Sequence, residues 1–207
     1  VADGQVTALA AGTATLTATA DGKSATCSVT VNAALSATEV TAEKWATIME
    51  SADNFTYHQT RDGDVGTHKI DGSTIAQIHH GQELIFVKDG NDYFSYVMSD
   101  GSWTKNPCTA DYYNSRIKVA AELLSYFKDD FASFAYADGK YTAASLDKTD
   151  DMNGILENVE VTFEKGALVG IKFSITYGET TFLFEVKDVG TTTITLPSEY
   201  TDTTSAP

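Results

Sequence analysis

Apolar and polar residues alternate along most of this chain, the pattern of β-strands that have one covered face and one face in water. The alternation is clearest at positions 159–163, 171–177 and 182–186, where Val, Ile, Phe and Tyr occupy every second position. Asp-Gly pairs separate runs of strand length. Because both residues of such a pair reach the backbone angles of tight hairpin turns at low cost, the sequence predicts consecutive antiparallel hairpins.

Two segments have the helical period instead. The first begins after Thr41, which can cap a helix, and Trp45, Ile48 and Met49 form one apolar stripe along it. The second is predicted over residues 109–131, and its apolar stripe is wider than a coiled-coil seam. Such a stripe indicates a helix pressed into a curved sheet. The fold class expected is therefore mainly β (α+β), with a strongly curved antiparallel sheet packed on two helices.

The first 33 residues read as three short strands, and their "DGQVTALAAGTATLTATADGKSATCSVTV" resembles the C-terminal half of a bacterial Ig-like domain of group 2. Such modules are usually stalks or adhesive spacers, so the resemblance implies an extracellular or cell-surface location. In these strands Leu16, Cys27, Val29 and Val31 would point inward. Without a partner sheet they need a cover, which could be the main domain, a second copy of the chain or neighbouring molecules in a crystal, so a dimer through this half-module is one expectation.

The remaining chain resembles the LolA/LppX type of bacterial lipoproteins and lipoprotein carriers. The resemblance rests on the order helix, hairpins, helix, hairpins, and on the closing "VEVTFEKGALVGIKFSI…FEVKDVGTTTITLP", whose last predicted strand is 191–197. The expected organisation is an Ig-like half-module at 1–33, a linker at 34–40, the LolA/LppX-like domain at 41–200 and a tail at 201–207.

That resemblance implies a hydrophobic or amphiphilic ligand bound between the sheet and the helices, with no enzymatic activity and no cofactor. The alternative is that the same side chains close a solid core. The candidate wall residues are Trp45, Ile48 and Met49 from the first helix, Leu124 and Phe127 from the second, and Phe173 and Phe184 from the sheet.

A second hypothesis is an adhesion or carbohydrate-binding module that presents aromatic side chains. Trp103 and the aromatic residues of 93–96 gather around one predicted hairpin. Because neighbouring strand residues face opposite ways, Phe94 and Tyr96 would share one face while Tyr93 takes the other. These residues could equally be core and cross-strand pairs. A third hypothesis is a purely structural domain of a surface assembly.

The net charge of the chain limits the classes of partner it can bind. It has 29 acidic residues against 14 Lys and Arg among 207, for a formal net charge of -15. So acidic a surface repels phosphate backbones, which argues against a nucleic-acid partner. No run of 18 apolar residues occurs, so no transmembrane segment is expected.

Four histidines are the obvious metal ligands, at positions 58, 68, 79 and 80. A metal site needs ligands that converge on one point. Adjacent residues of a strand point to opposite faces, so His79 and His80 are not expected to join one site. No Ser-His-Asp signature, phosphate-binding loop or HExxH motif occurs. We therefore expect ordinary surface histidines, no metal and no identifiable catalytic residue.

Two weaker signals complete the picture. Asp151, Asn153, Gly154 and Glu160 have some of the spacing of an EF-hand loop, but Thr149 stands where an Asp is expected, so an acidic segment before a strand is favoured. Cys27 and Cys108 could pair in an oxidising compartment. The alternation around Cys27 instead favours a small buried side chain, and a disulfide is not expected.

Overall fold

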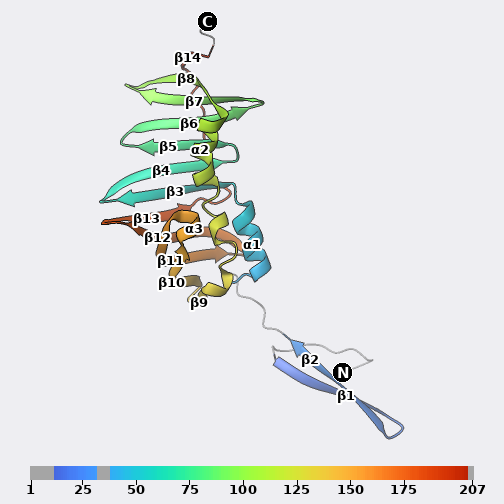
Figure 1. The fold of residues 1–207 in the computed structure, drawn as a ribbon. Coiled ribbons are helices and arrows are strands. Elements are labelled where there is room, and N and C mark those ends of the chain that lie inside the picture. The colour runs from blue at the N-terminus through green and yellow to red at the C-terminus, as the bar shows by residue number, and fades with distance from the viewer. Residues whose placement is uncertain (1–11, 32–37, 205–207) are drawn as a thin grey trace. The chain divides into compact units, whose positions relative to one another are not determined.

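The computed structural model describes residues 12–31 and 38–204, which divide into two compact units, Val1–Ser36 and Ala37–Pro207 (Figure 1). In the first unit, β1 (Gly12–Ala20) and β2 (Lys23–Val31) form an antiparallel hairpin. The first of the three strands expected in residues 1–33 lies outside the described residues, as does most of the predicted linker.

The side chains of this hairpin are more exposed than the sequence suggests. Leu16, Val29 and Val31 are only partly buried. Cys27 is exposed, so the prediction of a buried position for it is wrong. The reason is that a two-stranded hairpin has no second layer of its own to cover the inward face.

The second unit is mainly β, and its described residues contain one sheet of twelve strands. The order across the sheet is β14-β8-β7-β6-β5-β4-β3-β13-β12-β11-β10-β9. Neighbours are antiparallel except β14 and β8, which are parallel. The strands are β3 (Asn54–Arg61), β4 (Asp64–Asp71), β5 (Thr74–His79), β6 (Gln82–Asp89), β7 (Asp92–Ser99), β8 (Ser102–Cys108), β9 (Ala135–Ala137), β10 (Lys140–Lys148), β11 (Gly154–Glu164), β12 (Ala167–Tyr177), β13 (Thr180–Lys187) and β14 (Thr201–Asp202).

Two meanders make up this sheet, and Figure 1 shows them joined where β13 lies beside β3. Three of the predicted Asp-Gly turns are present at Asp62, Asp100 and Asp138, where the φ of Asp is near 50° and the φ of the following glycine is also positive. At Asp71-Gly72 and Asp89-Gly90 the aspartate is instead the last paired residue of its strand, and the turn begins at the glycine. This geometry matches the twist of the flanking strands and fixes their register. The segment expected to be a tail begins with β14, which pairs with β8.

Helix α1 (Ala42–Ser51) is capped by Thr41, whose hydroxyl accepts a hydrogen bond from the Lys44 N–H, as predicted. Helix α2 (Ala110–Ala121) is shorter than expected. Beyond it the chain forms two single 3-10 turns, η1 (Ser125–Phe127) and η2 (Phe131–Ser133). A one-turn helix, α3 (Thr149–Met152), precedes β11.

Side chains bond the backbone where α2 ends early. Ser125 bonds the Glu122 carbonyl oxygen, and the buried indole of Trp45 donates to the Phe127 carbonyl oxygen at 2.7 Å. Each carbonyl thus accepts a side-chain bond in addition to a backbone one, from the Tyr126 N–H at Glu122 and from the Asp130 N–H at Phe127. The single helix predicted over 109–131 is therefore wrong beyond Ala121.

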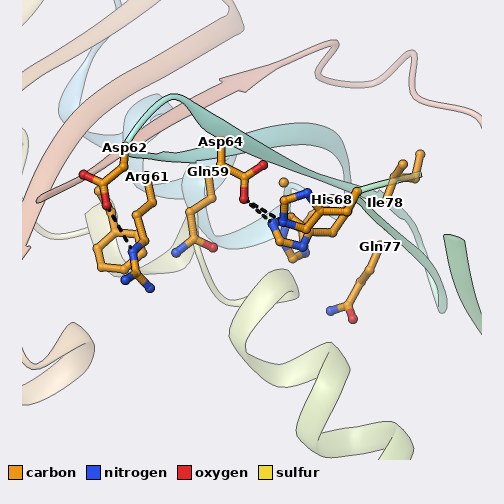
Figure 2. A pocket seen from close by; sticks show the side chains of 11 residues that line it. Gln59, Arg61, Asp62, Asp64, His68, Gln77 and Ile78 are labelled. Atoms are coloured by element: carbon orange, nitrogen blue, oxygen red, sulfur yellow. Dashed lines mark ion pairs between the residues drawn. The ribbon is translucent and has the colours of Figure 1, made fainter. Parts of the chain in front are cut away.

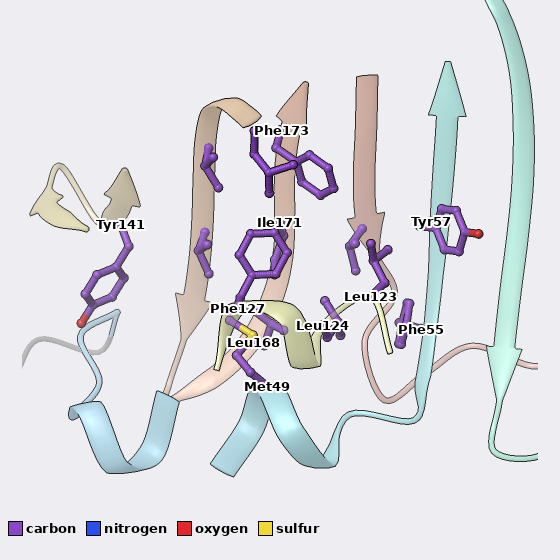
Figure 3. Packing of buried hydrophobic residues seen from close by; sticks show 14 of the residues in the cluster. Met49, Phe55, Tyr57, Leu123, Leu124, Phe127, Tyr141, Leu168, Ile171 and Phe173 are labelled. Carbon is purple, nitrogen blue, oxygen red and sulfur yellow. The ribbon is translucent and has the colours of Figure 1, made fainter. Parts of the chain in front are cut away.

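One face of the sheet carries the core. Figure 3 shows Met49, Leu124 and Phe127 packed between the strands and α1, with Phe173 reaching in from β12. Trp45 is fully buried at the centre of an aromatic cluster. Its ring centroid lies 4.9 to 5.7 Å from those of Phe134, Tyr141, Phe163 and Phe131.

The opposite face is covered in part by the C-terminal segment. Residues 191–197, expected to be a strand, are irregular. The Asn54 side chain bonds both the N–H and the carbonyl of Thr192, at 2.9 Å each, so that backbone needs no strand neighbour. Ile194 then packs on a small cluster with Tyr96 and Trp103.

The bond between Trp45 and Phe127 gives a test of this packing. In Trp45→Phe the buried Phe127 carbonyl loses the nearer of its two donors and the core loses part of a ring, which should lower the free energy of unfolding by about 1–3 kcal/mol. Urea denaturation followed by circular dichroism measures the change. Trp103→Phe, at a half-buried position on the opposite face, should cost clearly less; equal costs would contradict the role given to Trp45.

Candidate functional site

An open hollow of about 610 Å3 lies on the core-bearing face of the sheet, where β3, β4, β5 and β13 meet. Figure 2 shows its side chains projecting to one side of these strands. Its lining residues are Gln59, Arg61, Asp62, Asp64, Gly66, His68, Gln77, Ile78, His79, His80 and Phe182.

The hollow arises because rows of cross-strand partners change from apolar to polar residues across the sheet. One row runs from Val161 through Ile171 and Val186 to Tyr57, and continues as His68 and Gln77. Its first four members are buried, and the last two are polar and only partly buried.

The two rows nearer the hairpin ends also change from apolar to polar residues between β13 and β3. One passes from Phe184 to Gln59, and the next from Phe182 to Arg61 and Asp64. The apolar core therefore gives way to polar groups on the same face, at the β13–β3 junction.

Asp64, His79 and His80 meet at the rim of this hollow. The Asp64 Oδ2 atom lies 3.0 Å from His79 Nε2 and 3.0 Å from His80 Nε2, and Figure 2 draws both contacts as dashed lines. The two imidazole centroids are 4.0 Å apart. All three side chains are exposed, by 43% for Asp64, 56% for His79 and 68% for His80.

The expectation that His79 and His80 cannot act together is wrong. Strand β5 ends at His79, and His80 lies in the turn to β6 with a φ of 50°, followed by Gly81 with a φ of 76°. His80 thus occupies the position that Asp takes in the Asp-Gly turns. The left-handed backbone breaks the alternation and brings both imidazoles to Asp64. The sequence signal was the pair His80-Gly81.

Gly66 makes room for this arrangement. A Cβ atom at position 66 would lie 3.4 Å from His79 Cδ2 and 3.6 Å from His68 Nε2. The His79 ring thus lies against the β4 backbone at ordinary contact distance, beside His68. The hollow is thus shaped by a glycine inside a strand, which often marks a close approach.

His68 forms the inner wall. Its ring stacks on Tyr57, with centroids 4.4 Å apart and planes inclined by 2°. Its buried Nδ1 atom has no hydrogen-bond partner among the described residues. Burial, together with the charges of His79 and His58, lowers the pKa of His68 from 6.5 to about 4. His68 is therefore neutral at physiological pH.

The side chains predicted to line a lipid cavity belong mostly to the packed core. Trp45, Met49, Leu124, Phe127 and Phe173 are almost completely inaccessible and contact one another in one cluster. The two other candidates from the helix and the sheet, Ile48 and Phe184, are partly buried. Ile48 lines a shallow groove of about 430 Å3 beside α1.

Trp103 lies elsewhere, in a hollow of about 470 Å3 between the start of β8 and residues 197–201. Tyr200, which is 41% exposed, lines the same hollow and packs edge-on against Tyr96 at 5.2 Å. As predicted, Phe94 and Tyr96 share this face, while Tyr93 contacts Tyr113 of α2 on the other.

The residues with EF-hand-like spacing and the two cysteines do not form sites. Glu160 lies inside β11 and pairs with Lys140 at 2.8 Å, and α3 occupies the start of the proposed calcium loop. Cys27 and Cys108 are both free cysteines. Across the described residues, the only group of three or more metal-ligating side chains close together is Asp64, His79 and His80.

Neither a scan against protein-family models nor a search of curated proteins finds a match for this chain. The two family resemblances of the sequence therefore stay predictions. None of the helices within the described ranges has the length and apolar character that a bilayer crossing requires.

The lowered pKa of His68 predicts a pH dependence of stability. The His68 imidazole binds a proton more readily in the unfolded chain than in the folded one. Its contribution to the free energy of unfolding is therefore complete above pH 6.5 and is lost as the pH falls towards about 4. His68→Phe keeps a ring against Tyr57 but cannot titrate. Urea denaturation at several pH values should show a shallower decrease for the variant, by at most about 1.4 kcal/mol per pH unit; identical slopes would contradict the assignment.

Proposed function

We propose that this chain is a secreted or cell-surface protein without enzymatic activity that binds an amphiphilic small molecule on the core-bearing face of its large sheet. The observation that carries this proposal is the hollow of about 610 Å3 at the β13–β3 junction. Its size falls in the range of about 300–1,000 Å3 that is typical of small-molecule sites.

The lining of the hollow suits an amphiphile. Phe182 provides an apolar wall that continues the core row of β13, while Gln59 and Gln77 offer amide groups. Arg61 is exposed and lies 3.5 Å from Asp62, where it can also meet an anionic head group. The ligand would lie beside the packed core rather than among its side chains.

Two further parts of the proposal rest on the sequence. Residues 1–33 resemble a bacterial Ig-like half-module, which supports a surface location. The order of elements in the second unit resembles LolA/LppX-type proteins, which supports a sheet that bends around its helices. The contacts of α1 and α2 with the same sheet face fit this arrangement.

A fluorescent fatty acid tests the proposed site. The purified chain should bind this probe at one site, and extraction with organic solvent should release co-purified lipid. Phe182→Ala removes the apolar wall and should weaken probe binding about five-fold or more, since a partly buried phenylalanine contributes roughly 1 kcal/mol of apolar burial.

The matched control is Phe94→Ala, which truncates a partly buried phenylalanine on the opposite face. It should leave probe binding unchanged. No probe binding by the unmodified chain, or equal losses in both variants, would contradict the proposal.

The hollow around Trp103 favours a second candidate function, carbohydrate binding. Trp103 and Tyr200 offer aromatic surface beside Ser102, Ser198 and Glu199. A sugar ring presents C–H groups on its faces and hydroxyl groups at its edge, so it suits aromatic rings that are flanked by polar groups.

A glycan array tests this second candidate. Binding by the unmodified chain should be lost in Trp103→Ala and kept in Tyr112→Ala, which removes an exposed aromatic side chain of α2. A glycan signal that survives Trp103→Ala would exclude this hollow as the site. If neither fatty acid nor glycan binds, the structural-domain hypothesis is favoured.

A further inference from the structure

Two hairpin turns bring three metal-ligating groups together at the rim of the hollow. Asp64 opens β4 directly after the turn at Asp62-Gly63, and His79 and His80 lie at the turn between β5 and β6. The Asp64 carboxylate oxygen and the two Nε2 atoms all lie within 4.8 Å of one another.

We propose that Asp64, His79 and His80 bind a divalent transition-metal ion of the class that prefers imidazole, with Zn2+ as the representative. Nε2 of histidine and a carboxylate oxygen are common zinc ligands, with bond lengths of about 2.0–2.2 Å. Tetrahedral geometry at these lengths places ligand atoms about 3.3 Å apart. The two observed contacts of 3.0 Å need only a small expansion to admit the ion.

The backbone preorganises these ligands. His80 is held by a left-handed turn position, with a φ of 50°, and Gly66 leaves space for the His79 ring. Asp64 and His79 lie on strands whose register the sheet fixes, and His80 follows in the turn, so little backbone freedom remains to be lost when a metal binds. Preorganisation of this kind favours affinity.

The charge around the site is compatible with a cation. Arg61, the paired residue of Asp64 across β3 and β4, directs its guanidinium to Asp62 at 3.5 Å and lies 5.9 Å from the Phe182 ring centroid. The protein as a whole carries a net charge of -15, which attracts cations.

Three protein ligands would leave a tetrahedral ion with one coordination position open to water or to a ligand atom. His68 lies behind the site, with its Nε2 atom next to Gly66. Calcium and magnesium prefer oxygen ligands, so a site with two imidazoles should discriminate against them. This inference does not depend on the binding of an amphiphile.

The experiment uses the untagged full chain with Cys27 and Cys108 alkylated, because tags and thiols also bind zinc. Isothermal titration and equilibrium dialysis with Zn2+ should give one ion per chain, and excess Mg2+ should not displace it. His79→Gln and His80→Asn each remove one imidazole, and Asn tolerates the left-handed backbone of position 80. Since loss of a ligand's supporting partner alone typically costs 10–100-fold, each variant should weaken binding by about ten-fold or more.

His58→Gln is the matched control, because His58 lies on the opposite face of β3, where its Nδ1 atom contacts the Thr67 hydroxyl at 2.9 Å. It should bind Zn2+ as the unmodified chain does. Long-range 1H–15N spectra of the histidine rings should show that Zn2+ changes the Nε2 signals of His79 and His80 and not that of His58.

The opposite results would overturn the site. If the unmodified chain does not bind Zn2+, Asp64 only accepts hydrogen bonds from the two histidines. If binding survives His79→Gln or His80→Asn at full strength, the ion lies elsewhere and the three-ligand site is wrong.

Discussion

The second unit depends on the closure of one sheet face around Trp45. The indole ring meets four other aromatic rings, and its N–H holds the Phe127 carbonyl, so α1 and the 3-10 turns after α2 are locked together over the strands. A buried indole N–H without an acceptor would be costly, and so would a buried carbonyl without a donor. This bond satisfies the indole N–H, and the carbonyl accepts from the Asp130 N–H as well. The apolar rows of β12 and β13 then complete the core, and the same rows turn polar once they reach β3 and β4.

Much of this fold can be predicted from the sequence because many of its elements depend on neighbouring residues. The Asp-Gly turns, the Thr41 cap and the alternation in β7 depend on residues within a few positions of one another. The two errors have a common cause. The end of α2 depends on Trp45, 82 residues from Phe127, and the irregular path of residues 191–197 depends on Asn54, 138 residues from Thr192. Hydrogen bonds between such distant residues override the local preference for helix or strand, and no pattern in the neighbouring sequence predicts them.

The site shows a different kind of failure. Neighbouring residues face opposite ways only inside a strand, and His80 lies one residue beyond the end of β5. Seven Asp-Gly pairs had already marked the turns, and His80-Gly81 repeats their pattern with histidine in place of aspartate. As a turn residue, His80 need not point to the face opposite His79. The third member, Asp64, could not have been found in this way, because its approach depends on the pairing of β3, β4 and β5.

Strand pairing also explains why the three groups converge here and not at the other turns of this sheet. Thr67 pairs with Ile78, so His79 lies beyond the last pair, next to Gly66, where no side chain competes for the space. The ring can then extend diagonally towards Asp64, and the turn carries His80 to the same oxygen. At Asp100 and Asp138 the turns are alike, but the residue in the left-handed position is a carboxylate rather than an imidazole. The chemistry of the site therefore comes from one histidine in a turn and one glycine in a strand, and the sheet supplies the rigidity that makes their positions useful.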